Sequence, residues 1–182
     1  MKKSVYISLF AALISVGAFI QIPLPLGVPI VIQDMMAILS GFLLGPLYGS
    51  LAVLVFLVLG SIGLPVFTGK AGIQVILHGL TGGFLVGYLV AALVSGFFAL
   101  LLDKVSKNHK ILPWIIAFLG SVLAFASIFI LGLYQFAKVG EVSLSKAFIA
   151  SVLPYLPGTV IKILVIIPLA KRFRPIMKNY LY

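Results

Sequence analysis

Long apolar stretches, separated by short polar or glycine- and proline-rich turns, make up almost the whole chain. A helix of about 20 apolar residues crosses the roughly 30 Å of hydrocarbon in a bilayer. Segments of 14 residues are short for a full span, so the second and third segments are expected to tilt or to stop short of one face. The pattern predicts six helices, over residues 4–22, 31–44, 47–60, 75–102, 111–134 and 148–170.

Two connections are apolar but unsuited to helix. Residues 22–30 contain three prolines, and residues 60–72 are rich in glycine and proline. Proline removes a backbone donor and clashes within a helix, so we expect both stretches to be loops. An apolar loop suits a cover over the mouth of a cavity. The connections over 103–110 and 137–146 are polar turns instead.

The composition fits a membrane protein. Of 182 residues, 63% are hydrophobic and only 9% are charged, whereas a soluble domain needs far more surface charge. We expect an all-α membrane protein with one domain over residues 1–182. Lys2 and Lys3 before an apolar run resemble a signal peptide, but no small-residue cleavage site precedes a soluble domain, so the first segment is interpreted as a retained helix.

The net charge of +10 is distributed as in membrane proteins rather than as in nucleic-acid-binding proteins. Basic residues gather at segment ends, and cytoplasmic loops carry the excess of such residues. Six spans with both termini in the cytoplasm best satisfy this rule, and they place both proline-rich loops and Pro157 on the outer side. The cytoplasmic set is Lys2, Lys3, Lys104, Lys107, Lys110, Lys171, Arg172, Arg174 and Lys178, and the outer set is Lys70, Lys138 and Lys146.

Lys162 lies inside the last apolar segment. A lysine at the centre of a membrane helix costs roughly 2.5–3.5 kcal/mol, so such a residue usually faces a partner, a cavity or a ligand. Pro157 and Gly158 predict irregular backbone before it, which is tolerated at membrane depth where it lines a cavity. Thr159 shares a helix face with Lys162. The alternative is a lysine that extends to the headgroups.

Asp34 is the only acidic residue predicted inside an apolar segment, and it follows Gln33. It either pairs with Lys162, accepts a hydrogen bond from a ligand, or is a helix-start carboxylate at the interface. Gln74 and His78 lie near the start of the fourth segment, where a lone histidine is more often an interfacial residue than a ligand. The other histidine, His109, is on a cytoplasmic turn, which argues against a two-histidine metal site.

The sequence contains none of the motifs that would indicate an enzyme. The chain has no cysteine, no phosphate-binding Walker sequence, no HExxH and no G-x-S-x-G. We therefore expect no enzyme activity, no metal and no cofactor. A mostly apolar outer cavity with a few polar groups and one cation is typical of a small-molecule site. The residues predict capture of a small, partly apolar, acidic solute from outside.

Several stretches in this order resemble the BioY family, the biotin-binding S components of energy-coupling factor (ECF) transporters. The resemblance covers roughly residues 20–100 and 150–175. The matching stretches are Ile22–Gly27 with Val28-Pro29 and Gln33, Gly41–Leu51, Leu59–Phe67, Thr81–Gly87, and Leu153–Gly158 with Lys162.

The resemblance implies a six-helix S-component fold in a prokaryotic plasma membrane, with a high-affinity biotin site near the outer face. A transmembrane coupling protein and two cytoplasmic ATPases would drive uptake, and the family's small-residue contact with the coupling protein would fall on Ala11, Ala12 and Ser15. Biotin would be the transported ligand. Lys162 would face its carboxylate or ureido oxygen with Thr159 beside it, Phe67 and Tyr155 would wall the ring, and Gln33, Gln74 and Asp34 are further candidates.

The chain also departs from the family pattern. Family members usually carry Pro-Gly-Asp before the lysine of helix six, where this chain has Pro157-Gly158-Thr159. The usual Leu-Gly-Pro before Thr-Gly-Gly is His78-Gly79-Leu80. We hypothesise that Asp34 supplies the acid that position 159 lacks. The alternatives are an S component for another vitamin, a solute carrier working without ATPases, and a structural subunit in which Lys162 merely pairs with Asp34.

Overall fold

The structure, a computed structural model, describes residues 2–22, 30–105 and 109–181. Nearly all of this chain is helical, as predicted. The helices are α1 (Lys2–Gly17), α2 (Gln33–Ser61), α3 (Ile73–His78), α4 (Gly82–Val105), α5 (Leu112–Val139), α6 (Leu144–Ser151) and α7 (Leu156–Leu181), with a 3₁₀ turn over Leu153–Tyr155. Two short antiparallel strands, β1 (Gln21–Ile22) and β2 (Ile30–Val31), pair between α1 and α2.

The predicted break at Gly45-Pro46 is confirmed, because α2 is a hairpin of two helical limbs. Gly45 has φ 85° and ψ 177°, a conformation that a residue with a side chain rarely adopts. The two limbs then pack so closely that a Cβ at Gly49 would lie 2.6 Å from the Cα of Gly41. We call residues 33–44 the first limb and residues 46–61 the second limb.

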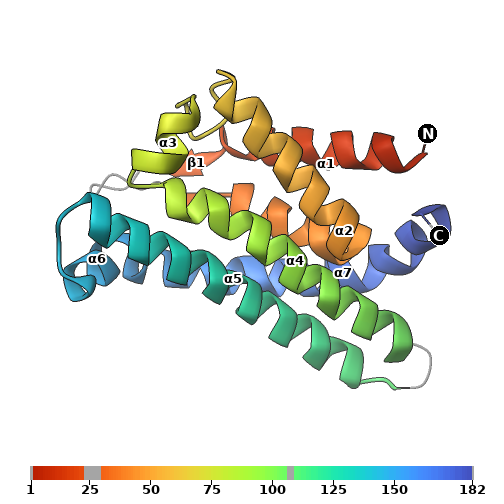
Figure 1. The fold of residues 1–182 in the computed structure, drawn as a ribbon. Coiled ribbons are helices and arrows are strands. Elements are labelled where there is room, and N and C mark those ends of the chain that lie inside the picture. The colour runs from red at the N-terminus through yellow and green to blue at the C-terminus, as the bar shows by residue number, and fades with distance from the viewer. Residues whose placement is uncertain (1, 23–29, 106–108, 182) are drawn as a thin grey trace.

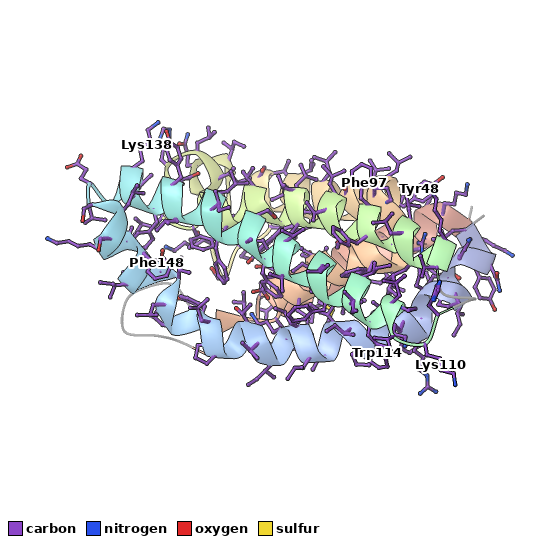
Figure 2. All side chains as sticks on the ribbon, turned by 90° about the horizontal axis from the view of Figure 1, so that it is seen from below. Tyr48, Phe97, Lys110, Trp114, Lys138 and Phe148 are labelled. Atoms are coloured by element: carbon purple, nitrogen blue, oxygen red, sulfur yellow. The ribbon has the colours of Figure 1, made fainter. Side chains whose placement is uncertain are left out.

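The bundle is built around α2, α4 and α5, which make the most extensive helix contacts. Helix α1 packs on α2, and α7 lies against α2 and α5. Figure 1 shows that both chain termini lie at one end of the molecule, whereas α3 and α6 lie at the other. We call these the terminus end and the site end. In Figure 2, Tyr48, Lys110 and Trp114 mark the terminus end, and Lys138 and Phe148 mark the site end.

Several predicted boundaries are wrong. The predicted helix over 148–170 is divided, because α6 ends at Ser151 and α7 begins only at Leu156, and the fifth helix continues to Val139 rather than ending at residue 134. Helix α1 ends at Gly17 rather than at residue 22, since the chain turns there into β1. Residues 75–102 are not one helix: the chain is extended at Gly79, and the Gln135 side chain of α5 donates hydrogen bonds to the carbonyls of Ile76 (2.7 Å) and Gly79 (2.9 Å). The last helix continues to Leu181, so the predicted basic tail is helical. The predicted loop over 22–30 lies mostly outside the described residues.

The outer surface suits a membrane. In the part of the chain that the structure describes, four helical stretches are long and apolar enough to cross a bilayer: α2, α4, α5 and residues Leu144–Leu181. Large apolar side chains such as Phe97, Ile130 and Leu164 are exposed on the outside of the bundle, and Figure 2 shows Phe97 at the surface. A water-facing surface would not carry so many, whereas lipid accommodates them.

Candidate functional site

A narrow cavity lies among the helix starts at the site end. About 50 Å³ of it is open to a water-sized sphere. Its walls come from the start of α2, the loop before α3, the start of α4, the middle of α5, and the ends of α6 and of the 3₁₀ turn that follows it. The lining residues are Val31, Gln33, Asp34, Phe67, Thr68, Thr81, Phe84, Leu85, Tyr88, Ile128, Phe129, Ser151 and Tyr155. Four of the seven predicted binding residues are among them.

Phe67 forms one wall of this cavity, and the local sequence fixes its position. Its ring is fully buried, lies edge-on to Phe56 at 5.4 Å between centroids, and packs directly on Gly60. Any side chain at position 60 would occupy the place of the ring, so this glycine makes room for the aromatic wall. Phe67 therefore presents a rigid apolar surface to the cavity.

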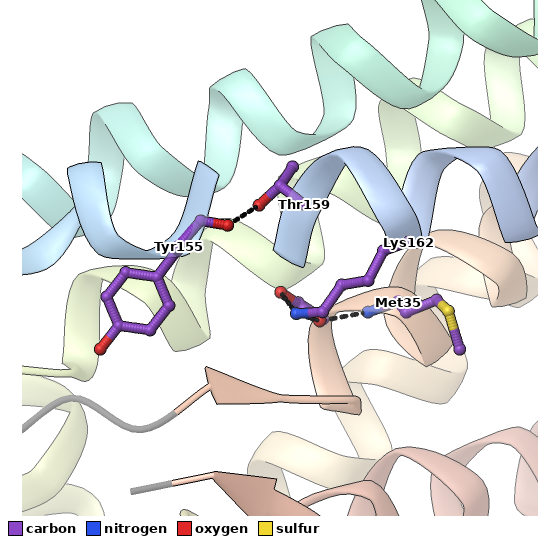
Figure 3. A network of polar contacts seen from close by, with 5 residues as sticks. Met35, Tyr155, Thr159 and Lys162 are labelled. Carbon is purple, nitrogen blue, oxygen red and sulfur yellow. Dashed lines mark hydrogen bonds and ion pairs between the residues drawn. The ribbon is translucent and has the colours of Figure 1, made fainter. Parts of the chain in front are cut away.

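Asp34 and Lys162 form an ion pair beside the cavity (Figure 3). The lysine Nζ donates to both carboxylate oxygens, at 2.8 and 2.7 Å, and both side chains are almost buried. The same carboxylate accepts a hydrogen bond of 2.6 Å from the backbone N–H of Met35. Pairing, one of the alternatives left open by the sequence, is therefore confirmed. Asp34 itself lines the cavity, whereas Lys162 does not and is connected to the cavity only through its ion pair with Asp34.

Thr159 is buried on the same helix but does not line the cavity. Its hydroxyl donates a hydrogen bond of 2.9 Å to the carbonyl of Tyr155 one turn earlier (Figure 3). Such bonds are common where a threonine sits within a helix. The hydroxyl proton is therefore already used in a hydrogen bond to the backbone. Toward Lys162 or a ligand, the Thr159 hydroxyl oxygen can only accept a hydrogen bond.

Two buried polar atoms on the cavity residues have no hydrogen-bond partner among the described residues: Gln33 Oε1 and the Tyr155 hydroxyl oxygen. The Gln33 Nε2 donates to the carbonyl of Val66 at 3.0 Å, which fixes the side-chain amide and leaves its oxygen as the unused acceptor. Leaving such a group unpaired in a buried place costs about 1–3 kcal/mol. Unpaired acceptor and hydroxyl groups beside a cavity are suited to receive the polar groups of a ligand.

Two predicted features lie elsewhere. Gln74 is exposed on α3 and lines a separate pocket, although that pocket shares Thr81 with the cavity. On α1, Ala11 is buried within the bundle and Ser15 is half-buried, with its hydroxyl bonded to the Ala11 carbonyl. Only Ala12 of the three predicted coupling residues is exposed. The outward small face of α1 consists of Ser4, Ser8 and Ala12.

Tyr88 is a cavity residue that the sequence analysis did not identify. It is buried on α4 and lines the same cavity as Gln33 and Asp34. The available signal was weak: a tyrosine directly after Gly87 in an otherwise apolar segment. Among the described residues, no group of three or more His, Asp or Glu side chains comes together to hold a metal ion.

The chain matches the BioY family over residues 1–179. It is 35% identical over 174 residues to the biotin transporter BioY of Thermotoga maritima, with 96% of each chain covered. It is 38% identical over 173 residues to the biotin transporter BioY of Rhodobacter capsulatus, covering 91% of this chain and 90% of that one.

A crystal structure of the S-component for biotin from an ECF-type ABC transporter has the same fold. The TM-score is 0.83 at 29% sequence identity, and the match covers 96% of this chain and 91% of the other. The family consists of transporter components rather than enzymes. With a family match along almost its whole length and the fold of this S-component, the chain belongs to the BioY family.

Proposed function

We propose that this chain is a biotin-binding S component of an ECF-type uptake transporter and that the cavity at the site end is its biotin site. The observation that carries the proposal is the cavity itself: aromatic walls, one ion pair and two unpartnered polar atoms, in the fold of a biotin S-component. Small-molecule sites are generally built in this way, with apolar walls and a few polar groups that fix orientation.

The chemistry of biotin matches these groups. Its fused ring carries two N–H donors and one carbonyl acceptor, and the remainder is an apolar thioether ring with a carboxylate tail. Gln33 Oε1 is placed to accept an N–H, and the Tyr155 hydroxyl to donate to an oxygen. Phe67 and Phe84 supply apolar walls for the ring. Lys162 is paired with Asp34 and does not itself line the cavity, so it would contact the carboxylate or the ureido oxygen of biotin once the cavity has widened. A charged donor forms the strongest hydrogen bonds available here.

Asp34 has the role that the family motif assigns to an acid at position 159. Its carboxylate lines the cavity and already holds Lys162, whereas the hydroxyl of Thr159 bonds to the backbone. A ureido N–H donating to Asp34 would share that carboxylate with Lys162. The cavity must widen to receive a vitamin, because the typical ligand pocket is about 300–1,000 Å³.

The assembly that we propose places both termini in the cytoplasm of a prokaryotic cell, with the chain in the plasma membrane. The terminus end carries most of the basic residues, the pattern of cytoplasmic ends. A coupling membrane protein would dock on the exposed Ser8 and Ala12 of α1, because small residues let another helix approach closely. Two cytoplasmic ATPases would complete the transporter.

The alternative ligand is a vitamin other than biotin, and one observation favours it. Position 159 carries a hydroxyl that is hydrogen-bonded to the backbone, where family members usually carry a carboxylate. The set of polar groups available to a ligand therefore differs. In a third reading, the Asp34–Lys162 pair only stabilises the bundle, and the protein binds no small molecule.

Calorimetric titration of the detergent-purified protein with biotin tests the proposal, with a panel of water-soluble vitamins alongside. We expect tight binding of biotin alone and an affinity loss of at least about 100-fold in Lys162→Ala. Lys138→Ala, which removes an exposed lysine, is the matched control. Binding of another vitamin in place of biotin would overturn the specificity, and no binding across the panel would favour the structural role.

A further inference from the structure

A second pocket adjoins the cavity on its outer side. It offers about 300 Å³ to a water-sized sphere, against about 50 Å³ in the cavity. Thr81 lines both spaces, so they are direct neighbours. We call this second space the outer pocket. Its lining residues are Lys70, Gln74, Val75, His78, Gly79, Leu80 and Thr81.

Lys70 is held at the outer pocket by a tight turn rather than by a loose loop. Phe67 and Lys70 exchange two backbone hydrogen bonds, each of 3.0 Å, around Thr68 and Gly69. Both central residues have positive φ, 50° and 81°, as in the two-residue turns of β-hairpins. Since Phe67 is buried in the cavity wall, this turn fixes the backbone of Lys70 directly outside that wall.

The charge of Lys70 is not neutralised by the protein. The chain has only three acidic residues, and all of them lie in the described part. Asp34 pairs with Lys162, Asp103 pairs with Arg174 and Lys178, and Glu141 makes no ion pair with a described residue. Lys70 is exposed, as are its neighbours Gln74 and His78, which are hydrogen-bonding groups. The outer pocket therefore offers one uncompensated cation with polar neighbours, whereas the cation beside the cavity, Lys162, is already paired with Asp34.

We propose that the outer pocket is an encounter site that captures the carboxylate of biotin through Lys70 before the ring passes into the cavity. This inference rests on the proposed function, and it assigns Lys70 and Gln74 to the approach of the ligand instead of to its final position. A charge at the rim of a site raises the association rate and makes it depend on salt, while dissociation depends on the buried contacts. Lys70 is thus a positioning residue for association.

The test measures association and dissociation rates of radiolabelled biotin separately, by rapid filtration of the full-length protein in nanodiscs. In Lys70→Glu we expect the association rate at low salt to fall about three- to tenfold, with the dissociation rate unchanged. The association rate of Lys70→Gln should lie between those of Lys70→Glu and the unmodified protein. The effect should vanish in high salt, since exposed charges are screened within about 3 Å at 1 M ionic strength.

Two controls separate this role from a general charge effect. Lys138→Glu makes the same charge change at the site end but outside the outer pocket, and it should leave association unchanged. Biotin amide, which lacks the carboxylate charge, should associate with Lys70→Glu as fast as with the unmodified protein.

Three outcomes would overturn the inference. These are an association rate in Lys70→Glu equal to that of the unmodified protein, an equal loss of association rate in Lys138→Glu, and a change in the dissociation rate of Lys70→Glu. If the unmodified protein binds biotin and one of these results appears, only the encounter site fails. If the unmodified protein binds no biotin, the proposed function fails as well.

Discussion

Helix α7 pairs its basic side chains with two carboxylates from helices distant in sequence, Asp34 near one end of the bundle and Asp103 near the other, and the two sites differ in how completely the protein satisfies them. At the terminus end, Arg174 is 2% exposed and donates to both carboxylate oxygens of Asp103, at 3.2 and 2.8 Å. Its third bond, of 3.0 Å, goes to the carbonyl of Leu43, and Lys178 lies 3.5 Å from the same carboxylate.

The terminus-end pair has the character of a structural clamp. Leu43 is in the last turn of the first limb of α2, where helix carbonyls lack partners within the helix. One guanidinium therefore joins α2, α4 and α7, and its fixed planar geometry suits such bidentate bonds.

The Lys162–Asp34 pair at the site end has similarly short contacts but lies in a different environment. Asp34 lines a cavity, and the unpartnered atoms of Gln33 and Tyr155 belong to residues of the same lining. The Arg174–Asp103 and Lys162–Asp34 pairs have similar shortest distances, 2.8 and 2.7 Å, but predict two roles. Where the protein completes the polar network, the pair holds helices together; where unsatisfied groups remain beside a cavity, the pair is available to a ligand.

The largest effect is expected at the terminus end. Arg174→Met should lower the free energy of unfolding by about 3–5 kcal/mol, because it leaves the carboxylate of Asp103 without its main buried partner. Thermal and denaturant unfolding in detergent measure this loss. Arg172→Met, which changes an exposed neighbour on the same helix, is the control. Equal stability of the two variants would show that the clamp does not hold the bundle.

A smaller effect, on binding, is expected at the site end. Asp34→Asn should weaken biotin binding by about 1.5–3 kcal/mol, or roughly 10- to 100-fold, since a charged hydrogen-bond partner is lost. Glu141→Gln is the matched control, because Glu141 is exposed and makes no ion pair within the described chain. Asp103 is unsuitable as a control because it pairs with Arg174.

A double variant sharpens this prediction. Thr159→Asp in the Asp34→Asn background places an acid at the position where the family usually has one, so it should recover part of the lost affinity. Titration of biotin into both variants measures the recovery. An Asp34→Asn variant that binds like Glu141→Gln, or a double variant with no recovery, would contradict the role given to Asp34.

The smallest effect is expected from Tyr155→Phe. Removing a hydroxyl that has no partner among residues 2–22, 30–105 and 109–181 should leave the free protein at least as stable, whereas biotin affinity should fall by about 1 kcal/mol, or roughly fivefold. Parallel unfolding and titration experiments measure the two quantities. A loss of stability with unchanged affinity would indicate that the hydroxyl has a structural partner instead of a ligand.

The sequence predicted those parts of the fold that depend on local signals. Gly45-Pro46 identified the hairpin of α2, and the lysine inside an apolar segment identified the helix that carries the site. The break before α4 was missed because its partner is distant: Gln135 bonds to Ile76 and Gly79 from α5. An apolar run interrupted by one glycine gives no sign of such a bond.

The sequence identified several residues of the candidate site but not how they are arranged in space. Lys162 and Asp34 were both identified, yet their pairing joins residues 128 positions apart, so the sequence left it open. Arg174 was interpreted as part of a cytoplasmic tail, because a basic cluster after an apolar segment is typical of one. Its burial follows from the meeting of α4 and α7, which no local pattern encodes.

Biotin titration of two matched variants tests the difference between the ion pairs most directly. Lys162→Met and Arg174→Met each remove one cation of α7, and affinity is measured per folded molecule. The account predicts that Lys162→Met loses at least about 100-fold in affinity while remaining folded, and that folded Arg174→Met binds biotin within about threefold of the unmodified protein. Normal affinity in Lys162→Met, or an equal loss in both variants, would contradict it.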